Sequence, residues 1–242
     1  PATPGIEMSG TVLAVGCAVT KFKAGDPVYV SSGMLGMTGA CYAEARLVPE
    51  DRLVALPESL ALEMAANIGY YLIADIFLHE CVPGRDVRSI LVSGASGGMG
   101  TAIVQTARAR GLQVIATVGS AAKRAHSLAM GAHHVLNHRD DDLACEVAKI
   151  TDGRGVDLLV DAWGGPRFGQ LLHCMAPWGL VILYNAVGGH PPPTVFDEWR
   201  KDMGKCISVM YFSMHMWETD LPARRRFIQR TVDLLASGMV HP

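Results

Sequence analysis

The sequence predicts an α/β protein built around a doubly wound parallel sheet, which a shorter β-rich region precedes. From residue 89 onward, short apolar segments alternate with helix-like segments. These apolar segments carry almost no charge, as is typical of parallel strands that are buried on both faces. The first of them leads into a glycine-rich turn and then directly into a helix-like segment, the order found in nucleotide-binding sheets.

The individual elements follow from the same alternation. Strands of the sheet are expected at residues 90–92, 113–118, 134–136, 156–160, 180–184 and 207–212. Helices are expected at residues 99–110, 121–130, 141–150, 166–175 and 222–237. The Gly- and Pro-rich residues 188–193 predict a turn.

The region before residue 58 has the pattern of short strands separated by turns. Strands are expected at residues 11–15, 27–30, 42–48 and 53–56. Ser59 is then expected to be the N-cap of a long apolar helix over residues 60–79. The predicted domains are residues 1–66 and 67–242.

Composition excludes several classes of protein. Of 242 residues, 50% are hydrophobic and 18% are charged, which indicates a sizeable folded core. The 21 basic and 23 acidic residues give a net charge of −2, which favours neither a nucleic-acid partner nor a membrane partner. No apolar run reaches the ~20 residues that span a bilayer. The six scattered cysteines contain no C-x-x-C pair, so reduced thiols and a cytoplasmic location are expected.

The glycine-rich turn is the motif with the clearest chemistry. Ala95-Ser96-Gly97-Gly98-Met99-Gly100 is a variant of the dinucleotide fingerprint with Ala in the first position. Small residues let the backbone approach a pyrophosphate closely, and the helix N-terminus offers free N–H groups to that anion. An ordinary strand–helix loop is the alternative, but the strand before it and the helix after it favour the cofactor. We therefore expect Ser96, Gly97, Gly98, Met99 and Gly100 to bind a dinucleotide.

The end of the second strand indicates which dinucleotide. NAD sites usually place Asp or Glu there to hold the ribose 2′-hydroxyl. Here residues 119–124 contain no acid. Ser120 can form a hydrogen bond with a 2′-phosphate, and Lys123 and Arg124 can supply positive charge. The two bases could instead be an ordinary solvated helix face, but together with the missing acid they favour NADPH.

Several motifs in order along the chain carry a family resemblance. They are Pro4-Gly5-Ile6-Glu7, Ser9-Gly10, Gly16, Lys23-Ala24-Gly25-Asp26-Pro27-Val28, Tyr42-Ala43-Glu44, Asn137-His138-Arg139, Gly153-Arg154-Gly155-Val156-Asp157 and Asn185. In these motifs the chain resembles the zinc-independent quinone oxidoreductase branch of the medium-chain dehydrogenase/reductases. The resemblance implies a Rossmann domain, a partial GroES-like domain, a homodimer and a chain that is truncated at both ends.

The resemblance also implies further site residues. Tyr211, Phe212 and Ser213 correspond to the segment whose backbone meets the nicotinamide, and Asn185 lies near the ribose. His138 takes the position beside the adenine, where an imidazole could stack. Tyr71 and Tyr70 are candidate proton donors, although aromatic residues on an apolar helix also fit a core role and water could donate instead.

No metal site is expected. Zinc-dependent relatives have Gly-His-Glu where this chain has Gly5-Ile6-Glu7, so Ile6 replaces a ligand. No G-x-S-x-G hydrolase motif is present either, which leaves the cofactor as the source of the chemistry.

Three functions remain open at the level of the sequence. The leading one is NADPH-dependent reduction of a small molecule, either a quinone or an α,β-unsaturated carbonyl. The second is an enoyl reductase domain of a polyketide or fatty-acid synthase that acts on an enoyl thioester. Ser93-Gly94-Ala95-Ser96 departs from the usual sequence of such domains, which makes this the weaker alternative. The third is a non-enzymatic NADPH-binding protein, as the lens crystallins of the family suggest.

Overall fold

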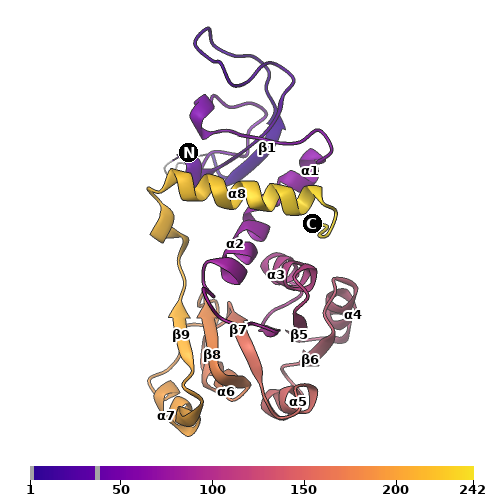
Figure 1. Ribbon diagram of the computed structural model, residues 1–242, viewed down its shortest axis with the longest axis vertical. Coiled ribbons are helices and arrows are strands. Elements are labelled where there is room, and N and C mark those ends of the chain that lie inside the picture. The colour runs from indigo at the N-terminus through magenta and orange to yellow at the C-terminus, as the bar shows by residue number, and fades with distance from the viewer. Residues whose placement is uncertain (1–2, 36–38) are drawn as a thin grey trace. The chain divides into compact units, whose positions relative to one another are not determined.

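The computed structural model describes residues 3–35 and 39–242, which form two compact units. One unit comprises Pro1–Asp75 and Met214–Pro242, and the other comprises Ile76–Ser213. Figure 1 labels the elements of both. The predicted domain limits, 1–66 and 67–242, stay a prediction.

The second unit contains a parallel sheet whose strand order is β6-β5-β4-β7-β8-β9. The strands are β4 (Ser89–Val92), β5 (Gln113–Val118), β6 (His134–Asn137), β7 (Val156–Asp161), β8 (Met175–Leu183) and β9 (Ser208–Tyr211). The chain builds outward from β4 to β6 and then returns to place β7 on the other side of β4. This reversal confirms the predicted doubly wound sheet.

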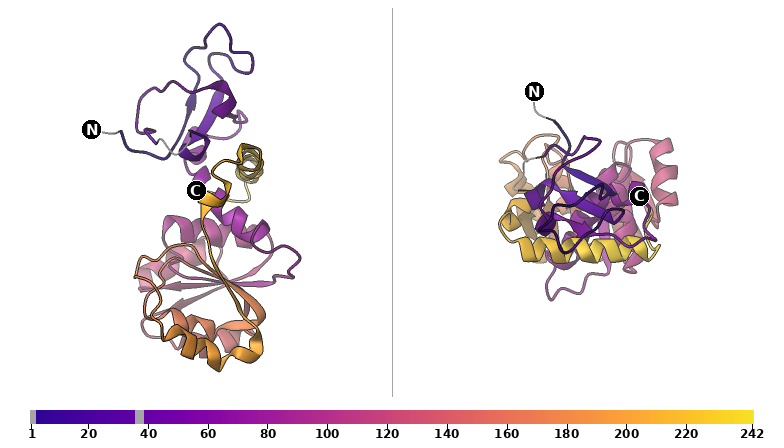
Figure 2. Two further views of the ribbon diagram at one scale, coloured as in Figure 1. Left: turned by 90° about the vertical axis from the view of Figure 1, so that its left-hand side faces the viewer. Right: turned by 90° about the horizontal axis from the view of Figure 1, so that it is seen from above.

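Helices cover both faces of this sheet, as the left view of Figure 2 shows. They are α3 (Gly98–Ala109), α4 (Ala121–Ala129), α5 (Leu143–Ile150), α6 (Phe168–Leu172) and α7 (Val195–Lys201). The helix predicted over 166–175 is shorter than expected, because the chain already enters β8 at Met175. The sequence did not predict α7, which begins directly after the proline-rich turn.

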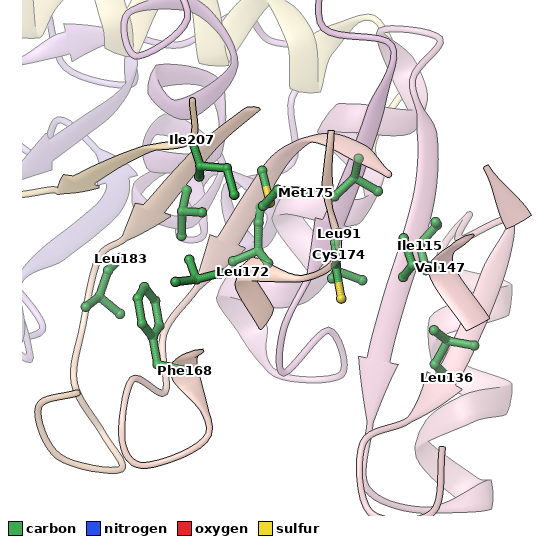
Figure 3. Packing of buried hydrophobic residues seen from close by; sticks show 13 residues of the cluster. Leu91, Ile115, Leu136, Val147, Phe168, Leu172, Cys174, Met175, Leu183 and Ile207 are labelled. Atoms are coloured by element: carbon green, nitrogen blue, oxygen red, sulfur yellow. The ribbon is translucent and has the colours of Figure 1, made fainter. Parts of the chain in front are cut away.

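The apolar strand residues form a core together with α5 and α6. Leu91, Ile115 and Leu136 project from neighbouring strands and belong to one buried cluster with Val147 and Phe168 (Figure 3). Leu91, Ile115 and Val147 have no exposed surface. Burial on this scale holds the strand ends, and the loops that follow them, in fixed positions.

The first unit contains an antiparallel sheet in the order β1-β2-β3, which agrees with the β-rich region that the sequence predicts. Its elements are β1 (Glu7–Thr11), β2 (Pro27–Ser31), η1 (Ser32–Leu35), η2 (Glu50–Arg52), β3 (Val54–Ala55), η4 (Met214–Trp217) and α8 (Leu221–Ala236). Helix α8 packs against α1 (Leu62–Ala65), β3, η1 and η4.

Two predicted strands of this region are wrong. Of residues 11–15 only Thr11 lies in a strand, and residues 42–48 join no strand in the described part of the chain. The N–H groups of Cys41 and Tyr42 donate to the carbonyls of Gly5 and Pro4, but no ladder continues from there. Tyr42 and Leu47 expose their side chains, so the apolar residues that suggested a strand here are not buried.

The helix predicted over residues 60–79 is divided into α1 and α2 (Ile68–His79). Ser59 is not its N-cap, because α1 begins after Ala61, which makes no capping hydrogen bond. The start of α2 is held by Glu7 of β1, whose carboxylate accepts hydrogen bonds from Gly69 N–H at 2.8 Å and from the Tyr29 hydroxyl at 2.6 Å. A partner distant in the sequence therefore fixes the beginning of this helix.

Among residues 3–35 and 39–242, no helix is long and apolar enough to cross a bilayer.

Candidate functional site

A cavity of 930 Å³ lies at the carboxyl ends of four neighbouring strands of the parallel sheet. Ser93 follows β4, Thr117 lies in β5, His138 follows β6 and Asp161 ends β7, and all four line the cavity. The cavity thus includes the point between β4 and β7 where the strand order reverses. Doubly wound sheets bind their ligands at this point, so the cavity is the candidate site.

The glycine-rich turn connects β4 to α3 beside this reversal. Gly94 adopts a φ of +63°, a conformation that favours glycine, and its carbonyl accepts the Gly97 N–H at 3.2 Å. Gly97 is the N-cap of α3 and offers no side chain to the helix. The first N–H groups of a helix have no partner within it, and they carry the positive end of the helix dipole. This turn is suited to an anion such as a diphosphate.

The glycines of the turn serve two different purposes. A Cβ on Gly100 would lie 2.4 Å from the Gly94 carbonyl oxygen and 2.6 Å from Ala95 Cα, so this glycine allows the helix to pack against the turn. A Cβ on Gly97 would meet only the Gly94 oxygen, at 3.7 Å. The protein itself therefore does not require a glycine at 97, and the open space there is available to a ligand.

The remaining predicted residues of the turn differ in exposure: Gly98 is exposed, and Ser96 and Met99 are half-buried. Gly94 of the turn lines the cavity, whereas the predicted residues from Ser96 to Gly100 do not. Their contact with a cofactor stays a prediction.

Asp161 joins the two strands at the reversal. Its carboxylate accepts hydrogen bonds from the Ser93 hydroxyl, from Trp163 N–H at 3.2 Å and from Gly164 N–H at 2.7 Å. The side chain is completely buried. It fixes the loops after β4 and β7 in one arrangement on the floor of the cavity. The sequence analysis missed this residue, although an acid that ends an apolar strand before two glycines was a usable signal.

The turn after β5 contains the residues that were predicted to recognise a 2′-phosphate. Ser120 is exposed and caps α4, accepting the Lys123 N–H at 3.4 Å. Lys123 lines the cavity. Arg124 does not line it, and its guanidinium donates to the Val135 carbonyl of β6. The structure thus brings Lys123 to the cavity, whereas Arg124 holds α4 against the sheet.

His138 lies at the same end of the cavity, surrounded by cationic side chains. Burial lowers the pKa of its imidazole, and the charges of Arg139, Arg167 and Lys123 lower it further. The ring is therefore neutral at pH 7, and its face can stack on a base. Arg139, Trp163 and Arg167 also line the cavity, and the sequence analysis did not select them.

The other residues that the resemblance suggested lie elsewhere in the same unit. Asn185 is exposed and accepts the neighbouring Ala186 N–H at 2.8 Å. Tyr211 and Ser213 are exposed at the end of β9, and Phe212 is buried edge-to-face against Phe77. None of these four predicted residues lines the cavity. Their predicted contacts with the nicotinamide end of a cofactor stay predictions.

The two candidate proton donors belong to the first unit. Tyr70 is half-exposed on α2, whereas Tyr71 is buried, and burial raises the pKa of Tyr71 to about 12. The Tyr71 hydroxyl therefore keeps its proton at neutral pH. The role of both residues as proton donors stays a prediction.

The region that holds zinc in other dehydrogenases has a different arrangement here. Ile6 is exposed, and the neighbouring Glu7 carboxylate is bound by Tyr29 and Gly69. Among the described residues, no three His, Cys, Asp or Glu side chains are grouped so that they could hold a metal ion.

Comparison with known proteins places these features in a family. Residues 98–229, more than half of the chain, match the family model of zinc-binding dehydrogenases. Residues 1–58 match the alcohol dehydrogenase GroES-like domain.

Two curated relatives and one solved structure illustrate the similarity. Human quinone oxidoreductase is 34% identical over 213 residues, which cover 87% of this chain and 61% of the relative. A 2-haloacrylate reductase from a Burkholderia species is 32% identical over 220 residues, which cover 90% of this chain and 64% of the relative. The structure of Escherichia coli quinone oxidoreductase complexed with NADPH matches with a TM-score of 0.82 at 26% identity, over 99% of this chain and 72% of that one.

The chain spans less than two thirds of the length of these curated relatives. The two family models nevertheless match residues of both compact units. The chain therefore belongs to the zinc-binding dehydrogenase family, within the quinone oxidoreductase-like branch of the medium-chain dehydrogenases/reductases.

Proposed function

We propose that the protein is an NADPH-dependent oxidoreductase that transfers hydride to a quinone or to an α,β-unsaturated carbonyl compound. One observation carries the proposal: the cavity at the strand reversal begins at Gly94 of the glycine turn and has a cationic end, and residues 119–124 after β5 contain no acid. The names of the relatives support it, since they are quinone oxidoreductases and a 2-haloacrylate reductase. The bound cofactor of the E. coli structure supports NADPH.

The residues that line the cavity and those of the two turns beside it have distinct roles in this proposal. The N–H groups at the start of α3 bind the diphosphate, and Gly97 lets the backbone approach it. Ser120 and Lys123 bind the 2′-phosphate, and the neutral His138 ring lies against the adenine. Bound NADPH would supply the hydride. Asp161 keeps the loops of the cavity in place and so orients the cofactor.

Reduction of a conjugated substrate also requires a proton. Tyr71 is the first candidate and Tyr70 is the second. The Tyr71 hydroxyl carries a proton at neutral pH, and its raised pKa makes it a weak acid that would need a strongly basic enolate. Asn185, Tyr211, Phe212 and Ser213 are proposed to contact the ribose and nicotinamide end of the cofactor. A cytoplasmic homodimer, which the sequence predicted, stays part of the proposal.

An enoyl thioester is the second candidate substrate, as in the reductase domain of a polyketide or fatty-acid synthase. It is favoured by the 2-haloacrylate reductase relative, whose name specifies a conjugated acid. Non-enzymatic NADPH binding is the candidate from another class. Turnover separates the three functions, because each predicts a different pair of rates with a quinone and with a thioester.

The first test is cofactor binding followed by turnover. We expect NADPH to bind at least about tenfold more tightly than NADH, a difference of ~1.4 kcal/mol in binding free energy. NADPH oxidation is then measured with a quinone and with crotonyl thioester. Equal dissociation constants for the two cofactors would contradict the NADPH assignment. NADPH binding without turnover of either substrate would favour the non-enzymatic alternative.

A further inference from the structure

The end of the cavity near His138 contains a group of cationic side chains that come from one helix and two loops. Lys123 lies on α4, Arg139 follows β6 and Arg167 lies between β7 and α6. All three line the cavity, and all three lower the pKa of His138. The strand order brings them together, since β6 and β5 are neighbours and β7 lies beyond β4.

Among the described residues, no carboxylate is paired with this group. In the described part of the chain, Lys123, Arg139 and Arg167 form no ion pair. Asp141 and Asp142 line the same cavity, and each is bound to a backbone N–H instead: Asp141 accepts the Asn137 N–H at 2.6 Å, and Asp142 caps α5 through the Cys145 N–H at 3.1 Å. The three cations are the charges that lower the pKa of His138.

Gly119 allows this group to form at the end of β5. A Cβ there would lie 3.0 Å from His138 Cε1 and 3.3 Å from Arg139 Nε, closer than an ordinary contact. The place that an acidic side chain takes in NAD sites is therefore bordered by an imidazole and a guanidinium. This arrangement is suited to an anion on the ribose 2′ oxygen.

Arg167 is held in position by the backbone of the neighbouring loop. One of its terminal nitrogens donates to the His138 carbonyl at 2.9 Å. A guanidinium has five N–H donors in a fixed plane, so this bond leaves others free to bind an anion. Planar pairs of N–H groups match two oxygens of a phosphate, which makes such contacts strong and selective.

We propose that Arg139 and Arg167 are specificity-determining residues that, together with Lys123, bind the 2′-phosphate of NADPH. The proposal rests on the function proposed above, which places a dinucleotide in this cavity. It assigns the selectivity to the loops after β6 and β7 as well as to the turn after β5. A phosphate monoester carries close to two negative charges at pH 7, which suits a group of three cations.

Binding of cofactor fragments provides the test, because fragments need neither nicotinamide nor turnover. The full chain and its Arg139→Gln, Arg167→Gln and doubly substituted variants are titrated calorimetrically with 2′,5′-ADP and with 5′-AMP, which lacks the 2′-phosphate. We expect each single variant to lose about five- to tenfold in affinity for 2′,5′-ADP and less than about twofold for 5′-AMP. The NADPH and NADH affinities should change in the same ratio. Arg167→Lys should restore only part of the loss, because it keeps the charge without the planar donors.

Arg200→Gln is the matched control, since Arg200 is an exposed arginine of α7 that does not line the cavity. It removes the same charge and should leave both fragment affinities unchanged. Equal losses for 2′,5′-ADP and 5′-AMP, or no loss in either arginine variant, would overturn the inference. If the unaltered protein prefers NADPH and the variants keep that preference, only this inference fails. If the unaltered protein binds neither dinucleotide, the proposed function fails as well.

Discussion

At the scale of single residues, Gly97 and Gly100 differ in whether the fold needs a glycine at that position. Gly100 is needed by the protein, since any Cβ there would overlap the Gly94 carbonyl and the Ala95 backbone. Gly97 has an ordinary backbone conformation, with φ −84°, and room for a Cβ. The fingerprint therefore combines one position that serves packing with another that we assign to the ligand.

Alanine substitutions separate these two roles. We expect Gly97→Ala to leave the melting temperature nearly unchanged and to weaken NADPH binding about tenfold or more, because the methyl group occupies the space of the diphosphate. Gly100→Ala should lower the free energy of unfolding by about 1–3 kcal/mol, because the helix must move away from the turn. Thermal melts and cofactor titrations measure both effects.

Gly204→Ala is the control for this pair, because a Cβ on Gly204 has open space and lies outside the cavity. It should affect neither stability nor binding by much. If Gly97→Ala kept full NADPH affinity, the diphosphate would not lie against this turn.

At the scale of elements, β7 is anchored to the start of β4 by one carboxylate. Asp157 accepts hydrogen bonds from the N–H groups of Arg88, at 2.9 Å, and Ser89, at 3.0 Å, and it pairs with Arg154. Burial opposes its ionisation, but the hydrogen bonds from Arg154 and Arg88 outweigh burial and hold the pKa of Asp157 below its ordinary value. The ionised carboxylate thus stabilises the pairing of the two central strands.

This anchor predicts a pH-dependent contribution to stability. Because the folded-state pKa lies below the unfolded value of about 3.9, the contribution is present above that value and is lost as the pH falls through the folded pKa. Asp157→Asn should lower the free energy of unfolding by about 1–3 kcal/mol at pH 7. The difference from the unaltered protein should shrink toward zero in acid, where Asp157 itself becomes neutral.

Urea unfolding at pH 7 and in acid measures this difference. Asp86→Asn is the control, because Asp86 pairs with Arg88 in an exposed position, with 70% of its side chain accessible. Such surface pairs contribute about 0–1 kcal/mol, so this variant should show little dependence on pH. A loss in Asp157→Asn that stays constant down to low pH would mean that the charge of the carboxylate is not what stabilises the strands.

The sequence predicted most of the parallel sheet, because each strand is a buried apolar run and each helix follows within a few residues. Helix α2 shows where such local reasoning fails. Asn67 and Gly69 are only weak local signals of a break after Ala66, and the group that holds the start of α2 is Glu7 on β1. The strand predicted over residues 42–48 is wrong for the opposite reason. The local pattern is that of a strand, but the fold provides no partner strand among the described residues.

The candidate site likewise contains residues that local sequence patterns predict and residues that only the fold brings together. The glycine turn and Lys123 were predictable, because the first follows a strand directly and the second follows the next strand at the expected distance. Arg139 and Arg167 were not predictable. They are distant from each other in the sequence, and only the order of β5, β6 and β7 brings them to the same end of one cavity.

At the scale of the whole molecule, the proposed binding residues of the cavity all belong to one of the two compact units. Its lining residues lie between Ser93 and His173, within the unit Ile76–Ser213. A ligand that binds a native unit and not its unfolded state raises the stability of that unit. Cofactor binding should therefore stabilise the unit with the parallel sheet directly.

The four tryptophans allow this effect to be measured for each unit. Trp163, Trp178 and Trp199 lie in the unit with the parallel sheet, and Trp217 lies in the other, where it packs edge-to-face on Phe227 of α8. A Trp217→Phe variant reports by fluorescence on the unit with the parallel sheet. A variant with phenylalanine at the three other positions reports on the unit with the antiparallel sheet.

We expect NADPH at about 100 times its dissociation constant to add ~2.7 kcal/mol to the stability of the unit with the parallel sheet. For a unit of this size, the melting temperature reported by Trp217→Phe should then rise by about 9 °C. NADH at the same concentration should raise it less, because it lacks the phosphate that the cationic end of the cavity is proposed to bind. Trp163 lines the cavity, so its emission should also be quenched directly on binding, and Trp163→Phe controls for this. If titration demonstrated NADPH binding while the Trp217→Phe reporter kept its melting temperature, the cofactor would bind outside this cavity.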